Sequence, residues 1–264
     1  MKNHITLLDG SIHDEKKILE QMNDDAFYYG ELSTKALSSS AAKLLINSPK
    51  QYAYVTQYGQ KETQALRDGK LLHMFLLEPE KWEALNVVDV KVKRGKAWDE
   101  AVAEFGEVYT TKEKADAERL AQAVIRNNKA MAYFKNAQFE VPKIGYIGSE
   151  GNEVPFRAKA DIITQSGGIA DIKTTTNLKG FKYSARDYCY AAQAYIYCTL
   201  WDIPYYDWTY IVVDKGSLDI GIVPISEEFL QIGKEQTELA IERYITWIAD
   251  PNADLNDYYI TFTL

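Results

Sequence analysis

The chain is poor in cysteine and in positive charge, and each scarcity excludes a class of protein. Its 264 residues include only two cysteines, Cys189 and Cys198. Two are too few to hold an iron–sulfur cluster, which takes four protein ligands. The two cysteines also lie nine residues apart in one predicted helix, on opposite faces, so they cannot form a disulfide with each other. Stability must come from a packed core, for which a content of 46% hydrophobic residues is sufficient.

Long apolar runs are absent as well. No stretch is long enough to span a bilayer, and the first ten residues are too short and too mixed in character for a basic-apolar leader. We therefore expect a cytoplasmic protein that makes no membrane contact.

The surplus of negative charge limits the kinds of partner. The formal net charge is −8, and an acidic surface repels phosphates, which argues against a protein that coats nucleic acid over its whole surface. A DNA-binding chain of this charge needs local basic clusters. Charge runs are commonly solvated faces, but two clusters are candidates for DNA contact. They are Lys91, Lys93, Arg94 and Lys96, and further along the chain Lys179, Lys182 and Arg186.

Hydrophobic periodicity predicts a helical first half followed by a sheet. Helices are predicted at residues 39–46, 49–58, 62–77 and 112–127. Strands follow at 139–147, 154–164 and 169–175, then a long helix at 184–203 with Ser184 as its N-cap, strands at 206–213 and 218–224, and a helix at 226–248. This order indicates a single α/β domain over residues 1–264, with a mainly helical part (1–135), a sheet core (136–225), and a C-terminal helix and tail (226–264).

Two carboxylates and a lysine gather on the predicted strands around residues 154–175. The tight turn at Gly167–Gly168 sets these strands side by side, so that Asp161 faces Asp171. Asp171 and Lys173 share one face, while Ile172 points into a core. Paired carboxylates suit Mg²⁺, and a neighbouring lysine can orient an attacking water or neutralise charge on a phosphoryl group. Most Asp-Xaa-Lys triplets are solvated positions without chemistry, so the triplet alone leaves both interpretations open.

Two predicted helices carry further polar groups. In the helix at 184–203, Tyr190, Gln193 and Tyr197 share one stripe, and a glutamine in such a stripe must find hydrogen-bond partners if it is buried. In the helix at 62–77, Gly69 and His73 lie one turn apart. The glycine permits close backbone approach and the histidine is a candidate metal ligand, although a lone helical histidine is more often a satisfied core or surface residue.

A serine-rich segment begins the predicted helix at 39–46. Free N–H groups at a helix start attract anions, and Lys43 follows one turn later, so Ser38, Ser40 and Lys43 form a candidate site for a DNA phosphate. Plain N-capping by Ser38 or Ser39 explains the serines equally well, and the two roles are compatible.

Four separated motifs then occur in a characteristic order. They are Leu37-Ser-Ser-Ser-Ala-Ala-Lys-Leu-Leu-Ile-Asn-Ser-Pro49; Gly69-Lys-Leu-Leu-His73 with Leu77-Glu-Pro79; Lys159-Ala-Asp161 with Asp171-Ile-Lys-Thr-Thr175; and Tyr190-Ala-Ala-Gln193-Ala-Tyr-Ile-Tyr197. Together they resemble the motifs of PDDEXK-type nucleases, specifically the phage and prophage recombination exonucleases of the exonuclease VIII (RecE-like) group. The resemblance covers residues 38–200.

This resemblance implies a fold and a set of site residues. The fold is the PDDEXK (restriction-endonuclease-like) α/β fold, a mixed sheet flanked by helices, here with a helical N-terminal half. The metal ligands are His73, Asp161 and Asp171, where Asp171 replaces the family's usual glutamate. The catalytic set is Asp161, Asp171, Lys173, Gln193 and Tyr197, and Glu140 matches an acidic position on the preceding strand. The expected DNA contacts are Ser38, Ser40, Lys43, Thr174, Thr175 and Lys182.

The same resemblance implies an activity. We expect a Mg²⁺-dependent exonuclease, with Mn²⁺ as a candidate substitute, that digests double-stranded DNA ends 5′ to 3′. Its single-stranded product would pass to a phage single-strand annealing protein in a bacterial or phage-infected cytoplasm, and the enzyme would form a ring-like homo-oligomer. Two alternatives keep the fold: an endonuclease or repair nuclease with the same metal site, and a catalytically silent DNA-binding subunit. A carbohydrate enzyme that uses two carboxylates would leave Lys173 and Gln193 without a role.

Overall fold

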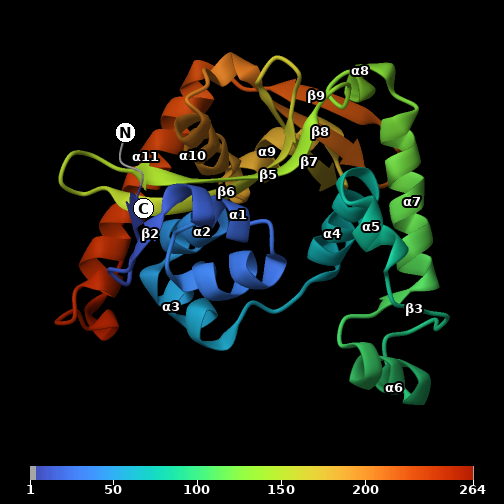
Figure 1. The fold of residues 1–264 in the computed structure, drawn as a ribbon, viewed down its shortest axis with the longest axis horizontal. Coiled ribbons are helices and arrows are strands. Elements are labelled where there is room, and N and C mark those ends of the chain that lie inside the picture. The colour runs from blue at the N-terminus through green and yellow to red at the C-terminus, as the bar shows by residue number, and fades with distance from the viewer. Residues whose placement is uncertain (1–3, 264) are drawn as a thin grey trace.

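A five-stranded mixed sheet lies at the centre of the molecule (Figure 1). The computed structural model describes residues 4–263. The strands follow one another in the order of the sequence: β5 (Gln138–Ile147), β6 (Val154–Ile163), β7 (Ile169–Thr175), β8 (Trp208–Asp214) and β9 (Ile220–Pro224). Only β7 and β8 are parallel, because two helices connect them, and the other neighbours are antiparallel. The predicted α/β fold with a mixed sheet flanked by helices is therefore confirmed.

Helices cover both faces of the sheet. Alternation along β8 sends Trp208, Tyr210 and Val212 to one face and Ile211 and Val213 to the other. The first face packs against α2 (Ser39–Asn47), α10 (Tyr190–Trp201) and α11 (Glu227–Tyr244), and the second packs against α4 (Gln64–Leu77), α7 (Thr111–Ile125) and α8 (Asn128–Met131). The site described below receives side chains from both of these helical layers.

A small N-terminal unit packs on β5 and was not predicted. It consists of the antiparallel strands β1 (His4–Thr6) and β2 (Ile12–Asp14), helix α1 (Glu15–Gln21) and a π-helical turn, η1 (Ala26–Gly30). Its apolar residues form a separate core with Ile144 of β5. The sheet prediction missed β1 and β2 because each is only three residues long, which is too short to show a clear alternating pattern.

The remaining elements connect these layers. They are η2 (Glu31–Thr34), α3 (Pro49–Tyr58), α5 (Pro79–Glu83), β3 (Val87–Val88), α6 (Lys96–Phe105), β4 (Tyr109–Thr110), η3 (Leu178–Gly180), α9 (Phe181–Asp187), η4 (Tyr205–Asp207), η5 (Ile245–Ala249) and η6 (Leu255–Asp257). Figure 1 shows α6 at the end of the molecule farthest from the sheet. Within residues 4–263, no helix combines the length and the apolar character that a membrane crossing requires.

The prediction of one continuous helix at 184–203 is wrong. The chain forms α9, leaves helical geometry at Tyr188 and Cys189, and starts α10 at Tyr190. Cys189 has a φ of 55°, in the left-handed region that interrupts a right-handed helix. Ser184 lies inside α9 and is no N-cap. Both cysteines are buried and free.

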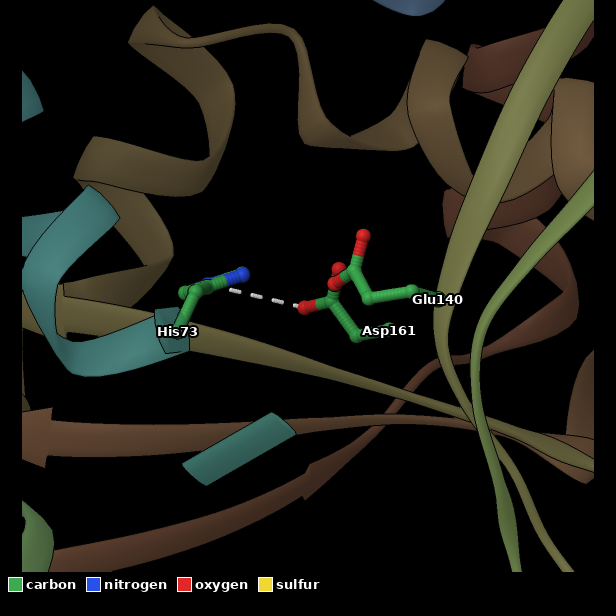
Figure 2. A group of neighbouring side chains, drawn as sticks. All are labelled: His73, Glu140 and Asp161. Atoms are coloured by element: carbon green, nitrogen blue, oxygen red, sulfur yellow. Dashed lines mark ion pairs between the residues drawn. The ribbon is translucent and has the colours of Figure 1, made fainter. Parts of the chain in front are cut away.

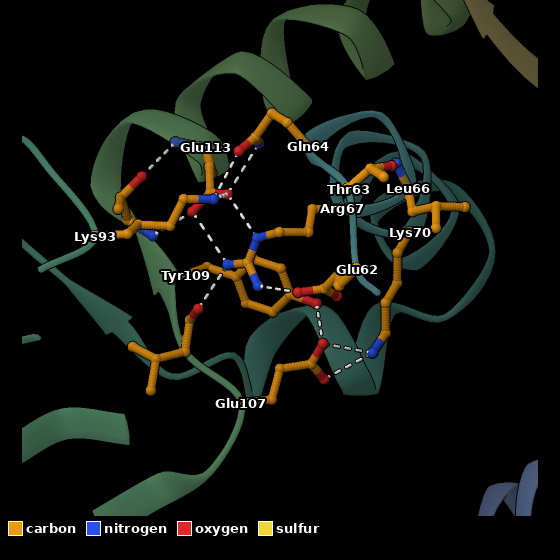
Figure 3. A network of polar contacts seen from close by, with 12 residues as sticks. Glu62, Thr63, Gln64, Leu66, Arg67, Lys70, Lys93, Glu107, Tyr109 and Glu113 are labelled. Carbon is orange, nitrogen blue, oxygen red and sulfur yellow. Dashed lines mark hydrogen bonds and ion pairs between the residues drawn. The ribbon is translucent and has the colours of Figure 1, made fainter. Parts of the chain in front are cut away.

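A buried arginine fixes the start of α4 (Figure 3). The Arg67 guanidinium donates to Glu113 Oε1 at 2.7 Å, to Glu62 Oε2 at 2.8 Å and to the Val108 carbonyl at 2.6 Å. Lys93 also donates to Glu113, at 2.8 Å. Lys93 was predicted within a basic cluster for DNA; in the structure it is part of this network, and its role as a DNA contact stays a prediction. His73 follows Arg67 by six residues in the same helix, about 9 Å along the axis. The network therefore anchors the helix that carries His73.

Candidate metal centre

The site lies where two strands separate. The ladder between β6 and β7 contains only two pairs, Ile162–Ala170 and Ile163–Ile169. At the next position Oδ2 of Asp161 accepts the backbone N–H of Ile172 at 2.8 Å, so a side chain takes the place of a strand partner. Asp161 and Asp171 thus face each other across the turn at Gly167–Gly168, as the sequence predicts, with both side chains buried.

Three potential ligands converge at this point (Figure 2). The ligand atoms of His73, Glu140 and Asp161 all lie within 4.8 Å of one another, although the residues come from α4, β5 and β6. His73 Nε2 lies 3.6 Å from Asp161 Oδ2 and 3.0 Å from the Ile172 carbonyl. Glu140 has a φ of 51°, an uncommon value for a residue with a side chain. This conformation lies between the ladder pairs Phe139–Ile162 and Val141–Ala160 and places Glu140 beside Asp161.

The electrostatics of this group fit a cation. Burial, followed by the charge of Asp161, raises the pKa of Glu140 from its ordinary value of 4.5 to about 8. Burial is the largest effect on His73 and would lower its pKa, but the charges of Asp161, Asp171 and Glu140 together raise the pKa above its ordinary value. Two crowded carboxylates and an imidazole, partly removed from water, therefore need positive charge. One imidazole and two carboxylates are ligands that a divalent cation accepts.

Asp171 and Lys173 form the second half of the site. Lys173 pairs with Asp171 Oδ2, and Gln193 of α10 donates to Asp171 Oδ1 at 2.6 Å. Burial is the largest effect on Lys173 and would lower its pKa, but the charges of Asp171 and Asp161, with the hydrogen bond to Asp171, together raise it. Burial raises the pKa of Asp171 to about 6, with Lys173 opposing and Asp161 adding to the effect. Lys173 is thus held as a cation beside the converging ligands, and the half-buried Gln193 finds its hydrogen-bond partner in Asp171.

The predicted residues take different positions in this arrangement. His73 and Asp161 lie in the three-residue group, whereas Asp171 lies beside it, engaged with Lys173 and Gln193. The assignment of Asp171 as a metal ligand stays a prediction. Tyr197 is buried, and its hydroxyl donates to the Lys159 carbonyl at 3.1 Å, so it braces β6 from α10.

The predicted DNA contacts differ in how far they are exposed. Ser38 caps α2, accepting the N–H of Ala41 at 3.2 Å, and Ser40 is exposed. Thr174 is half-buried, while Thr175 is buried and accepts the N–H of Asn177 at 3.2 Å. These positions, like Lys43 and the exposed Lys182, stay predictions as DNA contacts.

A row of charge beside the site was not assigned a role from the sequence. Arg157 and Lys159 precede Asp161 on the same face of β6, and both are buried. The Arg157 guanidinium lies 4.4 Å from the ring centre of Tyr28, and Lys159 pairs with Asp25 at 3.1 Å. The alternation Arg-Xaa-Lys-Xaa-Asp was a signal that all three side chains share a face. Their partners, Tyr28 in η1 and Asp25 just before it, are more than 120 residues away and had no such signal.

Comparison with known proteins agrees with this fold. Residues 38–252 match the model of a family described as a PDDEXK-like domain of unknown function. That match covers most of the chain, so the protein belongs to this PDDEXK-like family. The expected PDDEXK-type fold is therefore confirmed. No curated protein matches the chain.

Two solved structures are similar to the protein. One is a protein from Eubacterium rectale, provisionally named an exonuclease, with a TM-score of 0.65, 15% identity, and coverage of 91% of this chain and 95% of that chain. Another is a phage-related exonuclease from Haemophilus somnus 129PT, with a TM-score of 0.32, 14% identity, and coverage of 79% and 93%. The first likeness supports the fold, and the second is too distant to carry an argument.

Proposed function

We propose that this protein is a metal-dependent deoxyribonuclease, and that Mg²⁺ is its usual metal. The observation that carries the proposal is the position of Lys173, a half-buried ammonium paired with Asp171 and adjacent to the converging ligands His73, Glu140 and Asp161. Carboxylates near a single lysine suit phosphodiester hydrolysis, where a metal and a cation both face the phosphate. Membership of a PDDEXK-like family supports the same assignment.

Each residue has a distinct task in this proposal. Asp161 and Glu140 would hold the metal with His73, and the bound metal would supply an acidified water and neutralise phosphate charge. Lys173 presents its ammonium to the scissile phosphate. Asp171 keeps Lys173 in place and charged, and Gln193 fixes the orientation of Asp171 through its amide.

We further propose that the enzyme is an exonuclease of the exonuclease VIII (RecE-like) group. It would digest double-stranded DNA 5′ to 3′ from an end, act as a homo-oligomer, and supply single strands to an annealing protein. Two things support this finer assignment: the order of the four sequence motifs, and the name given to the Eubacterium rectale protein of similar fold. A net charge of −8 also favours recognition of one DNA feature, such as an end, over coating of the duplex.

The test is digestion of linear and closed-circular duplex DNA with Mg²⁺, Mn²⁺ or a chelator, with labels on each strand end. We expect loss of linear DNA alone, release of the 5′ label first, and no digestion with chelator. Lys173→Ala should reduce the rate by about 10²–10³, the cost of removing one stabilising charge from a phosphoryl site. Lys135→Ala is a matched control, since Lys135 lies outside the site.

Other outcomes would select the alternatives. Cutting of closed circles at comparable rates would favour an endonuclease. A folded protein that digests neither substrate with either metal, but binds DNA, would be a catalytically silent subunit. Digestion that survives both chelation and Lys173→Ala would refute the proposed site altogether.

A further inference from the structure

The break between α9 and α10 exposes one aromatic ring beside the candidate site. Tyr188 is the first of the two residues between the helices, and Cys189, with its left-handed backbone, is the second. Its side chain is 51% exposed. A continuous helix would keep its backbone hydrogen bonds through this segment, whereas the left-handed residue costs free energy. Such conformations persist where packing compensates for them or where they serve a function.

Tyr188 is the outer end of a column of rings. It stacks on Tyr190 with centroids 5.8 Å apart and an interplanar angle of 30°, and Tyr190 lies 5.6 Å from Tyr210 at the same angle. The Tyr210 hydroxyl donates to the Tyr190 carbonyl at 2.7 Å, which fixes the inner part of the column. Lys173 Nζ lies 5.1 Å from the ring centre of Tyr190. A single ring therefore separates the exposed Tyr188 from the lysine of the site.

A second cation accompanies the exposed ring. Lys43 Nζ, from the opposite segment α2, lies 4.4 Å from the ring centre of Tyr188. Burial lowers the pKa of Lys43, and Cys189 is the group that partly opposes this effect. Within residues 4–263 no ion pair engages the Lys43 ammonium, so it is available to an anion. A ring with a cation over it offers one partner to each part of a nucleotide, the ring to the base and the cation to the phosphate.

We propose that Tyr188 and Lys43 bind one unpaired nucleotide of the strand that enters the site: the Lys43 ammonium moves from the ring to the phosphate, and the base stacks on the ring in its place. The inference rests on the proposed nuclease function and adds a contact to it. Inside a duplex both faces of a base are covered by neighbouring bases, so only a base at an end or in a frayed segment can stack on Tyr188. The contact would therefore favour strand ends over internal sites.

The experiment is binding of a single-stranded oligonucleotide that carries a fluorescent 2-aminopurine, with the full-length protein in chelator so that no strand is cut. We compare wild type with Tyr188→Ala, Tyr188→Phe and Lys43→Gln. The matched control is Tyr183→Ala, because Tyr183 is also exposed and also lies under a lysine, but outside the column. Circular dichroism confirms that each variant is folded.

The expected result follows from the strength of one base stack. Tyr188→Ala should weaken binding roughly 5- to 150-fold and remove the quenching of 2-aminopurine, since a base–aromatic stack contributes about 1–3 kcal/mol. Tyr188→Phe should bind like wild type, because the ring is kept. Lys43→Gln should lower the salt dependence of binding by about 0.7 in the logarithmic slope, the share of one phosphate contact on a single strand.

Two results would overturn the inference. One is unchanged affinity and quenching in Tyr188→Ala, and the other is an equal loss in Tyr183→Ala, which would indicate a generic aromatic surface. Failure of the nuclease proposal has a different signature. Binding that depends on Tyr188, in a protein that cleaves no DNA with any metal, would keep this contact and discard the catalytic assignment.

Discussion

Replacing Glu140 with glutamine is expected to stabilise the metal-free protein at alkaline pH while it removes a ligand from the metal site. The side chain is nearly the same size, but the charge that crowds Asp161 is gone. The pKa of Glu140 is raised by burial and by Asp161 from 4.5 to about 8. The folded state therefore keeps a proton that the unfolded state has already lost, and the free energy of unfolding falls as pH rises between these two values.

The magnitude follows from this interval. At about 1.36 kcal/mol for each pH unit, the full interval corresponds to at most about 5 kcal/mol. Local relaxation and entering water reduce such penalties, so we expect Glu140→Gln to be more stable than wild type by about 1–3 kcal/mol near pH 9. The difference should nearly vanish near about pH 5, where Glu140 is protonated in the folded protein and already resembles glutamine.

Urea unfolding in chelator, at about pH 5 and about pH 9, measures both differences. Glu153→Gln is the control, because Glu153 is exposed in the turn before β6. Adding Mn²⁺ or Mg²⁺ should stabilise wild type by mass action and should stabilise Glu140→Gln much less, so that the order of stability reverses. Equal stability of the two proteins at alkaline pH without metal would refute the claim that Glu140 and Asp161 crowd each other.

Three further outcomes are expected. Glu113→Gln should destabilise the protein by about 3 kcal/mol at neutral pH, because it removes the buried carboxylate partner of the Arg67 guanidinium and leaves only the more exposed Glu62. Burial would raise the pKa of Glu113, but its hydrogen bonds hold it well below the usual range, so this stabilisation is lost as pH falls and urea titrations of the two proteins should converge in acid. Tyr197→Phe loses the bond to the Lys159 carbonyl, so its free energy of unfolding should fall by about 1 kcal/mol. Single-turnover cleavage should slow far less than in Lys173→Ala. A slowing as large as that of Lys173→Ala would make the Tyr197 hydroxyl a catalytic group. Gly233→Ala places a methyl group 2.0 Å from the Ala191 carbonyl oxygen and forces α11 away from α10. The free energy of unfolding should fall by about 1–3 kcal/mol. An unchanged melting temperature would contradict this close packing.

The sheet was predictable because its signals are local. The strand at 169–175 matches β7, and the strands at 139–147 and 154–164 differ from β5 and β6 by one residue at an end. The helix at 49–58 coincides with α3, where Pro49 occupies the first turn and Ser48 caps it. The break at Cys189 was not predictable, since cysteine has no preference for left-handed backbone, and the apolar pattern on both sides continues through it.

The candidate site divides in the same way. The shared face of Asp171 and Lys173 follows from alternation along one strand, and the stripe on α10 correctly directs Gln193 towards a polar partner. The convergence of Glu140 with His73 depends on a left-handed residue in β5 and on the anchoring of α4 by Arg67. Both are properties of the assembled fold, and neither leaves a periodic trace in the chain.

The side chain of Asp161 replaces a strand partner for the Ile172 N–H. This one acidic residue is therefore under selection both for the stability of the sheet and for the proposed metal site. Without Lys173, Asp171 can take up a proton and keep its bond to Gln193, so a lineage that no longer needs cleavage can lose the lysine. Loss of Asp161 would leave the buried N–H of Ile172 without a hydrogen-bond acceptor, at a cost of about 1–3 kcal/mol. Inactive descendants of this chain should therefore retain Asp161 long after Lys173 has been replaced. In genome surveys of such descendants, Lys173 is therefore a better marker of catalytic activity than Asp161.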